Sequence, residues 1–213
     1  PPARPGIGTL LWPRVQILSP EATFQPHRWR DDIARRIGLE SARQVASNPV
    51  RCGNKTDRYL FYEGVVNTNT ILQHHQSWDG LHLRNTSPNP LRNILVFLNG
   101  KSRPLQIEKI DSQEEVIIDN LDTDKAYHSL SHRAADEKVV DSQMIGEVPF
   151  DLSTLATRLR DEGLFADEAL AMAKSVLTTG IATTKGTRII YSIDRDTYDS
   201  IHPLKIHPKP EET

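Results

Sequence analysis

Residues 92–110 read RNILVFLNGKSRPLQIEKI, and this stretch decides the fold class. Its first part, 92–98, is dense in large apolar and β-branched side chains, which is typical of a buried strand. Asn99 and Gly100 then form a pair that favours the tight turn of a β-hairpin. The segment 105–110 alternates apolar and polar residues and therefore predicts the returning strand of that hairpin.

Further short strands are expected on both sides of this hairpin. The apolar patterns predict strands at 9–18, 57–66, 80–84, 115–119 and 188–193. A helical pair is expected within about 151–177, because leucines recur there at helical spacing. Gly163 is a stop signal that ends the first helix of the pair. Strands lead and helices come late, an order that predicts a mainly β fold, antiparallel and sandwich-like, with an appended α+β portion that contains the helical pair.

The composition changes near residue 122, where a polar stretch follows the predicted strands. We therefore expect a β-rich domain over 1–121 and an α+β portion over 122–213. In the second portion, 122–147 is expected to be linker-like. The sequence leaves open whether this portion packs on the β domain as one unit.

Composition and charge exclude several classes of protein. The chain has 213 residues, with 26 basic and 28 acidic side chains and a formal net charge of −2. This balance argues against a protein that binds nucleic acid through bulk charge. No apolar run approaches the roughly 18 residues of a membrane span, and no signal peptide is visible. Cys52 is the single cysteine, so no internal disulfide is possible.

Histidines supply the candidate metal ligands. His75, Asp79 and His82 could converge on one ion if a hairpin turns at Asp79 and Gly80. The adjacent His74 would then point to the opposite face of its strand. The alternative interpretation is that these residues are ordinary polar side chains near a turn.

A second histidine pair, His128 and His132, would share one face of a helix over 127–136. No glutamate lies between them in the manner of a His-Glu-x-x-His motif, so this spacing does not indicate a metal site. The chain also lacks a Gly-x-Ser-x-Gly motif and a phosphate-binding loop. The sequence therefore predicts no catalytic residue and no cofactor.

Tryptophans are the candidate contacts for a partner. Trp12, Trp29 and Trp78 lie in polar stretches, where an exposed indole would suit a sugar or a protein. Exposed, coplanar tryptophans would indicate a carbohydrate-binding β-sandwich. The strand that contains Pro13 could instead form an open sheet edge that a partner completes.

Residues 60–65 read LFYEGV and resemble the LFYRGVG motif of a family of large, uncharacterised bacterial proteins of planctomycete type, many of which carry export signals. Residues 99–105, 159–173 and 188–206 resemble further motifs of that family in the same order. The family's W-x-x-x-WF segment has no counterpart at 175–185, which contains no aromatic residue. The resemblance implies a cell-envelope or extracellular context and a place within a larger protein. It implies no catalytic residue.

These observations predict a non-enzymatic structural or interaction module of a larger bacterial cell-envelope or exported protein. Its expected partner is a protein or the rest of the assembly. Two alternatives stay open. One is a metal-dependent hydrolase that uses His75, Asp79 and His82, and the other is a carbohydrate-binding β-sandwich that uses the tryptophans.

Overall fold

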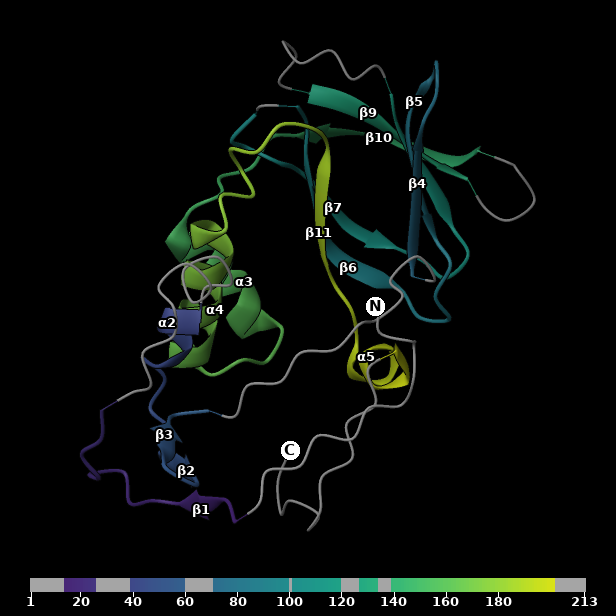
Figure 1. Cartoon of the computed structure of the whole chain (residues 1–213). Helices are drawn as coiled ribbons and strands as arrows, with labels where there is room; N and C mark the ends of the chain where they lie inside the picture. Colours follow the sequence, from purple (N-terminus) through teal and green to yellow (C-terminus); the bar gives the residue numbers. More distant parts are fainter. Residues whose placement is uncertain are drawn as a thin grey trace, which may run out of the picture. The chain divides into compact units, whose positions relative to one another are not determined.

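The computed structural model describes residues 14–25, 39–59, 71–99, 101–119, 127–133 and 139–201. These residues form eleven strands and four helices (Figure 1). The chain divides into two compact units, of which unit 1 comprises 1–65 and 150–184 and unit 2 comprises 66–149 and 185–213. Each unit therefore combines an early segment of the chain with a late one.

Unit 2 contains two antiparallel sheets. The five-stranded sheet has the order β10-β9-β8-β5-β4 and consists of β4 (Leu72–Gln76), β5 (Gly80–Asn85), β8 (Glu115–Asp119), β9 (Tyr127–Arg133) and β10 (Val139–Gly146). The three-stranded sheet has the order β11-β6-β7 and consists of β6 (Leu91–Phe97), β7 (Leu105–Ile110) and β11 (Arg188–Ser192). Helix α5 (Arg195–Ile201) follows β11. The mainly β fold predicted from the sequence is confirmed.

One apolar core takes side chains from both sheets of unit 2. The five-stranded sheet contributes Leu81, Leu83, Val116, Ile118 and Leu130, and the three-stranded sheet contributes Leu91, Ile94, Val96, Leu105, Ile107 and Ile110. Full burial of one such side chain stabilises the fold by about 1.5–3 kcal/mol. Two antiparallel sheets that share a core in this way are compatible with a β-sandwich.

The β6–β7 pair confirms the hairpin expected from residues 92–110. Ile94 lies opposite Ile107, and both side chains are buried. On the other side of β6, β11 pairs in antiparallel register with Ile189 opposite Val96. Strand β6 is therefore the central strand of its sheet. Leu95 and Phe97, whose side chains have the opposite direction to those of Ile94 and Val96, are buried as well, and burial on both faces explains the nearly continuous apolar sequence.

Two predictions for this part of the chain were wrong, the linker-like segment over 122–147 and the helix over 127–136, because β9 and β10 lie there. Strands β9 and β10 pair with each other, and β9 also pairs with β8. Among the described side chains of these strands, Leu130 and Ile145 belong to the core. Strand β9 takes its backbone partners from β8 as well as from β10, so the local composition does not reveal the strands.

Unit 2 also crosses the linear boundary expected between residues 121 and 122. Strands β9 and β10 lie beyond that boundary and extend the sheet that β4, β5 and β8 begin. Strand β11 pairs with β6, although almost a hundred residues separate them in the sequence. Strands can pair whatever their separation in the sequence. The pairing of strands, and not a linear boundary, therefore determines which residues belong to this unit.

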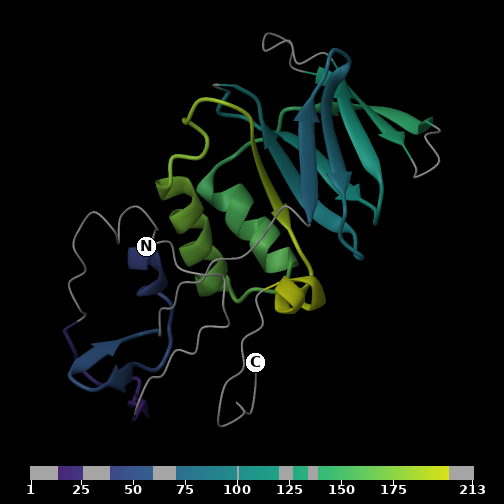
Figure 2. The ribbon, with the colours of Figure 1, turned by 45° about the vertical axis from the view of Figure 1, so that its right-hand side comes forward.

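Unit 1 contains a small sheet and three helices (Figure 2). The sheet has the order β1-β2-β3 and consists of β1 (Gln16–Ile17), β2 (Val50–Cys52) and β3 (Lys55–Asp57). The helices are α2 (Leu39–Ala42), α3 (Leu152–Asp161) and α4 (Ala166–Thr178). Helices α3 and α4 pack against each other, which confirms the helical pair.

Polar contacts connect the early and late segments of unit 1. The backbone N–H of Ala46 donates to Oδ2 of Asp167 at 2.7 Å, and this bond lowers the pKa of Asp167. Within the early segment, Arg43 forms a two-pronged contact with Asp57, with its Nη2 2.7 Å from Oδ2. Asp151 is the N-cap of helix α3, and its carboxylate accepts the N–H of Thr154.

Two predicted strands fall largely outside the described residues. Of the strand expected at 9–18, the structure describes 14–18, in which β1 spans Gln16–Ile17. Of the strand expected at 57–66, it describes 57–59, where β3 ends at Asp57. The motif at 60–65 lies outside the described residues.

Gly80 begins β5 at a point where two backbones come very close. Its φ of 150° lies where side chains are rarely tolerated. A Cβ at this position would overlap the carbonyl oxygen of Ile118 and lie 2.9 Å from the carbonyl carbon. Only glycine therefore allows β5 to start opposite Asp119 of β8.

Asn85 ends β5 and connects it to two loops. Its amide nitrogen donates to the carbonyl oxygens of Asn89, Ile110 and Asp111 at 2.8–3.1 Å. Its side-chain oxygen accepts the N–H and the hydroxyl of Ser87. Because Asn85 is fully buried, water cannot replace these partners.

We expect Gly80→Ala to lower the free energy of unfolding by about 2–5 kcal/mol, because it combines backbone strain with steric overlap. Gly186→Ala is the matched control, since Gly186 also has a positive φ but has open space around it. Urea denaturation of both variants separates the two contributions. Equal losses in the two variants would contradict the close approach at Gly80.

Asn85→Asp is expected to lower the free energy of unfolding by about 3 kcal/mol or more, because it removes buried donors and introduces a buried charge. Gln73→Ala, at an exposed position of β4, should change it by less than about 0.5 kcal/mol. Thermal or urea denaturation measures both values. A neutral Asn85→Asp variant would show that the amide contacts do not stabilise this end of β5.

Candidate functional site

The β4–β5 hairpin places two of the predicted histidines side by side. His75 of β4 lies directly opposite His82 of β5 in the antiparallel register. The two rings stack with centroids 4.3 Å apart and planes inclined by 22°. His74 pairs with Leu83 instead, so it has the opposite side-chain direction, as expected for adjacent residues of a strand.

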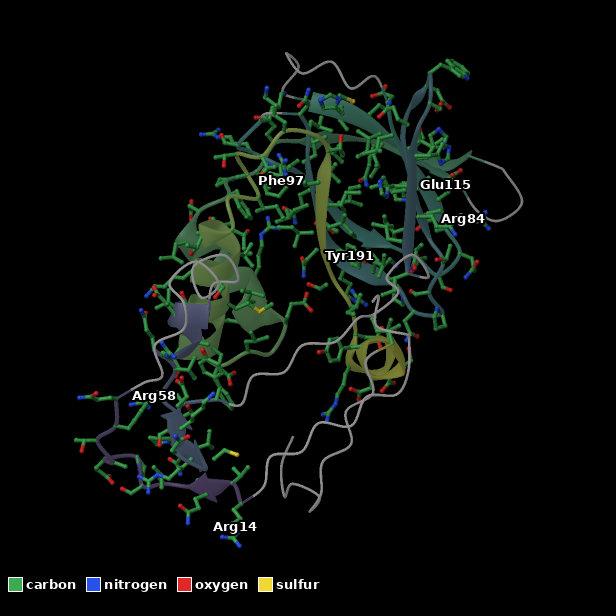
Figure 3. The ribbon with its side chains drawn as sticks, in the orientation of Figure 1. Arg14, Arg58, Arg84, Phe97, Glu115 and Tyr191 are labelled. Atoms are coloured by element: carbon green, nitrogen blue, oxygen red, sulfur yellow. The ribbon has the colours of Figure 1, made fainter. Side chains whose placement is uncertain are left out.

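A third residue comes from β8, the other neighbour of β5. His82 lies opposite Ile117, and Glu115 is two residues before Ile117, so its side chain shares the face of His82. The Oε1 atom of Glu115 lies 3.3 Å from Nδ1 of His82. Figure 3 labels Glu115 on the five-stranded sheet, beside the strands that carry the histidines.

His75, His82 and Glu115 form a convergent group. One ligand atom from each lies within 4.8 Å of the other two. The group has a graded environment, since His82 is buried, Glu115 is half-buried and His75 is exposed. It lies on the face of the sheet opposite the core, because the neighbouring Leu81 and Leu83 are the residues of β5 that enter the core. Among the described residues, no other group of histidine, cysteine and carboxylate side chains converges in this way.

Two residues of the turn between β4 and β5 contact Nε2, the other ring nitrogen of His82. Oδ1 of Asp79 and Oγ of Ser77 each lie 2.9 Å from Nε2 of His82. The Ser77 hydroxyl also donates a hydrogen bond to Asp79. The hydrogen bonds from His82 and Ser77 lower the pKa of Asp79 to about 2.

His75, Asp79 and His82 were predicted to converge on one point, and the structure brings together only the two histidines of this set. Asp79 contacts Nε2 of His82, whereas the third member of the convergent group, Glu115, approaches Nδ1 on the opposite side of the ring. Asp79 is thus placed to orient His82 rather than to complete the convergent group.

Ser77, His82 and Glu115 superficially follow the contact order of a serine-histidine-acid triad. In such a triad the serine gives its proton to the imidazole, and the acid supports the other ring nitrogen. Here the hydroxyl proton of Ser77 is directed to Asp79 instead. This arrangement orients His82, and it does not activate Ser77 as a nucleophile.

The second histidine pair belongs to a different part of the sheet. His132 contacts the carboxylate of Glu114, with Nδ1 2.7 Å from Oε1. His128 is buried, and its Nδ1 lies 3.3 Å from the carbonyl oxygen of Asp119. Both lie on strand β9 and not on a helix. The convergent group includes neither of them.

Of the three tryptophans predicted to contact a partner, the structure describes Trp78. Trp78 lies at the tip of the β4–β5 turn and is 96% exposed. Trp12 and Trp29 lie outside the described residues. The structure therefore places the exposed indole of Trp78 on the same hairpin as His75 and His82.

Sequence reasoning missed Glu115 and Ser77. Glu115 lies far along the chain from His82, and only the pairing of β5 with β8 brings them together. Ser77 gave one local signal, its place in the Ser-Trp-Asp-Gly turn, where short polar side chains bind nearby groups.

Comparison of the chain with protein-family models finds no matching model, and comparisons with curated proteins and with solved structures find no significant match. In the part of the chain that the structure describes, no helix has the length and apolar character needed to cross a membrane. The resemblance at residues 60–65 to exported bacterial proteins stays a prediction.

We expect the carboxyl of Asp79 to titrate with a pKa of about 2, well below its ordinary value of 3.8, because His82 and Ser77 hydrogen-bond its charged form. Carbon-13 NMR of the side-chain carboxyl measures this pKa directly. His82→Ala should raise the pKa toward 3.8, and Ser77→Ala should raise it by less, since His82 is the larger cause. An ordinary pKa in the unmodified chain would contradict the contact.

The same contact predicts how stability depends on pH. Because folding lowers the pKa of Asp79, the ionised form stabilises the folded state fully above about pH 4. This stabilisation is lost as the pH falls through about 2. The difference in unfolding free energy between the unmodified chain and Asp79→Asn should therefore be constant above about pH 4 and shrink below it.

Proposed function

We propose that the chain is a non-enzymatic interaction module of a larger bacterial cell-envelope or exported protein. In this proposal its contact site is the Trp78 hairpin, which we define as β4, β5 and the turn 77–79 between them. The observation that carries the proposal is the exposure of Trp78, whose side chain is 96% exposed.

An indole in water is costly, because it leaves a large apolar surface unburied. Trp78 is the most exposed of the large apolar side chains in the described part of the chain. Tryptophan is also enriched among the residues that contribute most to protein binding. Burial of this side chain against a partner would recover the apolar surface that the free chain leaves in water.

The edge of the sheet favours a protein as the partner. Strand β4 is the last strand in the order of the five-stranded sheet, as far as the described residues extend. Four of its five residues, Gln73 to Gln76, have exposed side chains. A strand at a sheet edge can accept an extended segment of another chain through backbone hydrogen bonds. We therefore propose that a partner strand pairs with β4 while Trp78 packs against it.

The cellular context rests on a separate observation. Residues 60–65 resemble a motif of exported bacterial proteins, and that resemblance supports a cell-envelope or extracellular location. The near-neutral charge is consistent with a protein partner rather than nucleic acid.

We expect a photo-crosslinking amino acid at position 78 of the full-length protein, expressed in its source bacterium, to give one discrete protein adduct. The matched control is the same amino acid at Met144, which is 66% exposed on β10 of the same sheet. Mass spectrometry of the adduct identifies the partner and the peptide that it contributes. Adducts at both positions, or at neither, would contradict a specific contact at Trp78. An adduct with polysaccharide would favour the carbohydrate-binding alternative.

Trp78→Ala should then weaken binding of the identified partner by at least about 30-fold, the effect typical of a hot-spot residue. It should leave the unfolding free energy of the chain within about 0.5 kcal/mol, because the side chain is exposed. Met144→Ala is the control for general loss of apolar surface. Equal weakening by both variants would show that Trp78 is not the contact.

A further inference from the structure

We propose that His75, His82 and Glu115 form a binding site for Zn²⁺ on the outer face of the five-stranded sheet. Each ligand comes from a different strand, and the three strands β4, β5 and β8 are neighbours in the sheet. The proposal goes beyond the proposed interaction function, since it does not depend on Trp78 or on any partner.

His82 and Glu115 already lie at a distance that suits a shared zinc ion, whereas the stacked ring of His75 must turn to point a nitrogen lone pair at that ion. Ligand atoms at about 2.0–2.1 Å from a tetrahedral zinc ion lie about 3.4 Å from one another. Nδ1 of His82 and Oε1 of Glu115 are already 3.3 Å apart. The three ligand atoms lie within 4.8 Å of one another, and His75, which is exposed, has the freedom to close the remaining gap.

The hydrogen bonds of His82 prepare its Nδ1 as a ligand. The hydrogen bond from Ser77 to Asp79 uses the serine proton, and we therefore assign the ring proton of His82 to Nε2, where it can donate to Asp79. With the ring proton on Nε2, Nδ1 has a lone pair that faces the carboxylate of Glu115. Two acceptors at this distance repel each other unless a cation lies between them. A zinc ion would remove the repulsion, and a second ring proton is the competing occupant.

The contact with Asp79 is the arrangement that supports a zinc-bound histidine. Metal-binding histidines almost always donate their other ring N–H to a carboxylate, a carbonyl or water. Asp79 and Ser77 fill this supporting position for His82. We therefore assign Asp79 as a positioning residue and not as a ligand.

The ligand types select the ion. Two imidazoles and one carboxylate suit zinc, whereas Ca²⁺ and Mg²⁺ prefer sites built from oxygen atoms alone. Three protein ligands would leave the fourth position of a tetrahedral ion to water. A zinc ion here would join the β4–β5 hairpin to β8 on the face that the core does not stabilise.

The test uses the untagged full chain, stripped of metal with EDTA and dialysed, because a histidine tag would itself bind zinc. Competition with a chromophoric zinc chelator measures the affinity, and elemental analysis after gel filtration measures the stoichiometry. We expect one equivalent of zinc, and a thermal unfolding midpoint that rises when zinc is added.

Single variants assign the ligands. Glu115→Gln keeps the shape of the side chain but removes its charge. Glu115→Gln and His75→Ala, each made alone, should each weaken zinc binding by at least about 100-fold. Asp79→Asn should weaken it by about 10–100-fold, as expected for a residue that supports a ligand. His74→Ala is the matched control, because His74 is the adjacent exposed histidine with the opposite side-chain direction, and it should leave the affinity unchanged.

Three outcomes would overturn the proposal. The first is the absence of stoichiometric zinc binding by the unmodified chain, which would leave a proton between His82 and Glu115. The second is an affinity that Glu115→Gln does not alter. The third is an equal loss in His74→Ala and His75→Ala, which would indicate ordinary surface histidines. The Trp78→Ala variant should bind zinc normally, so failure of the interaction proposal and failure of this one are distinguishable.

Discussion

The pairing of β5 between β4 and β8 is the constraint on which the rest of unit 2 depends. Its register points Leu81 and Leu83 into the core and His82 away from it. A slip of one residue would reverse both assignments and put an imidazole among the apolar side chains. Gly80 makes this register possible, because any side chain there would collide with the backbone of β8.

The candidate site is a consequence of the same register. The pairing with β4 puts His75 opposite His82, and the pairing with β8 puts Glu115 in a diagonal position next to it. The turn residues Ser77 and Asp79 contact Nε2 of the His82 ring. A single buried histidine thus receives contacts from four other side chains. The β4–β5 hairpin that carries His75 and His82 also exposes Trp78, so one hairpin presents both histidines and an apolar contact surface.

Each unit is assembled from segments that are distant along the chain. In unit 2, β11 returns after the helices to pair with β6. In unit 1, Asp167 of the late helical pair binds the backbone of Ala46 in the early segment. Neither unit can complete its contacts until both of its segments are present, so we infer that folding requires contacts of long sequence separation in both.

The sequence by itself determined the strongly apolar strands, above all the β6–β7 hairpin with its continuous run at 92–98 and its alternating run at 105–110. It also determined the helical pair, whose leucines repeat at helical spacing. It also indicated that His75 and His82 lie near each other, because a turn at Gly80 folds their strands together. The tertiary structure alone decided that the polar segments 127–133 and 139–146 are strands, because β9 pairs with β8 on one side and with β10 on the other. It alone placed Glu115 rather than Asp79 in the convergent group. The physical reason is the same in both cases: hydrogen bonds between strands join residues that no local pattern connects.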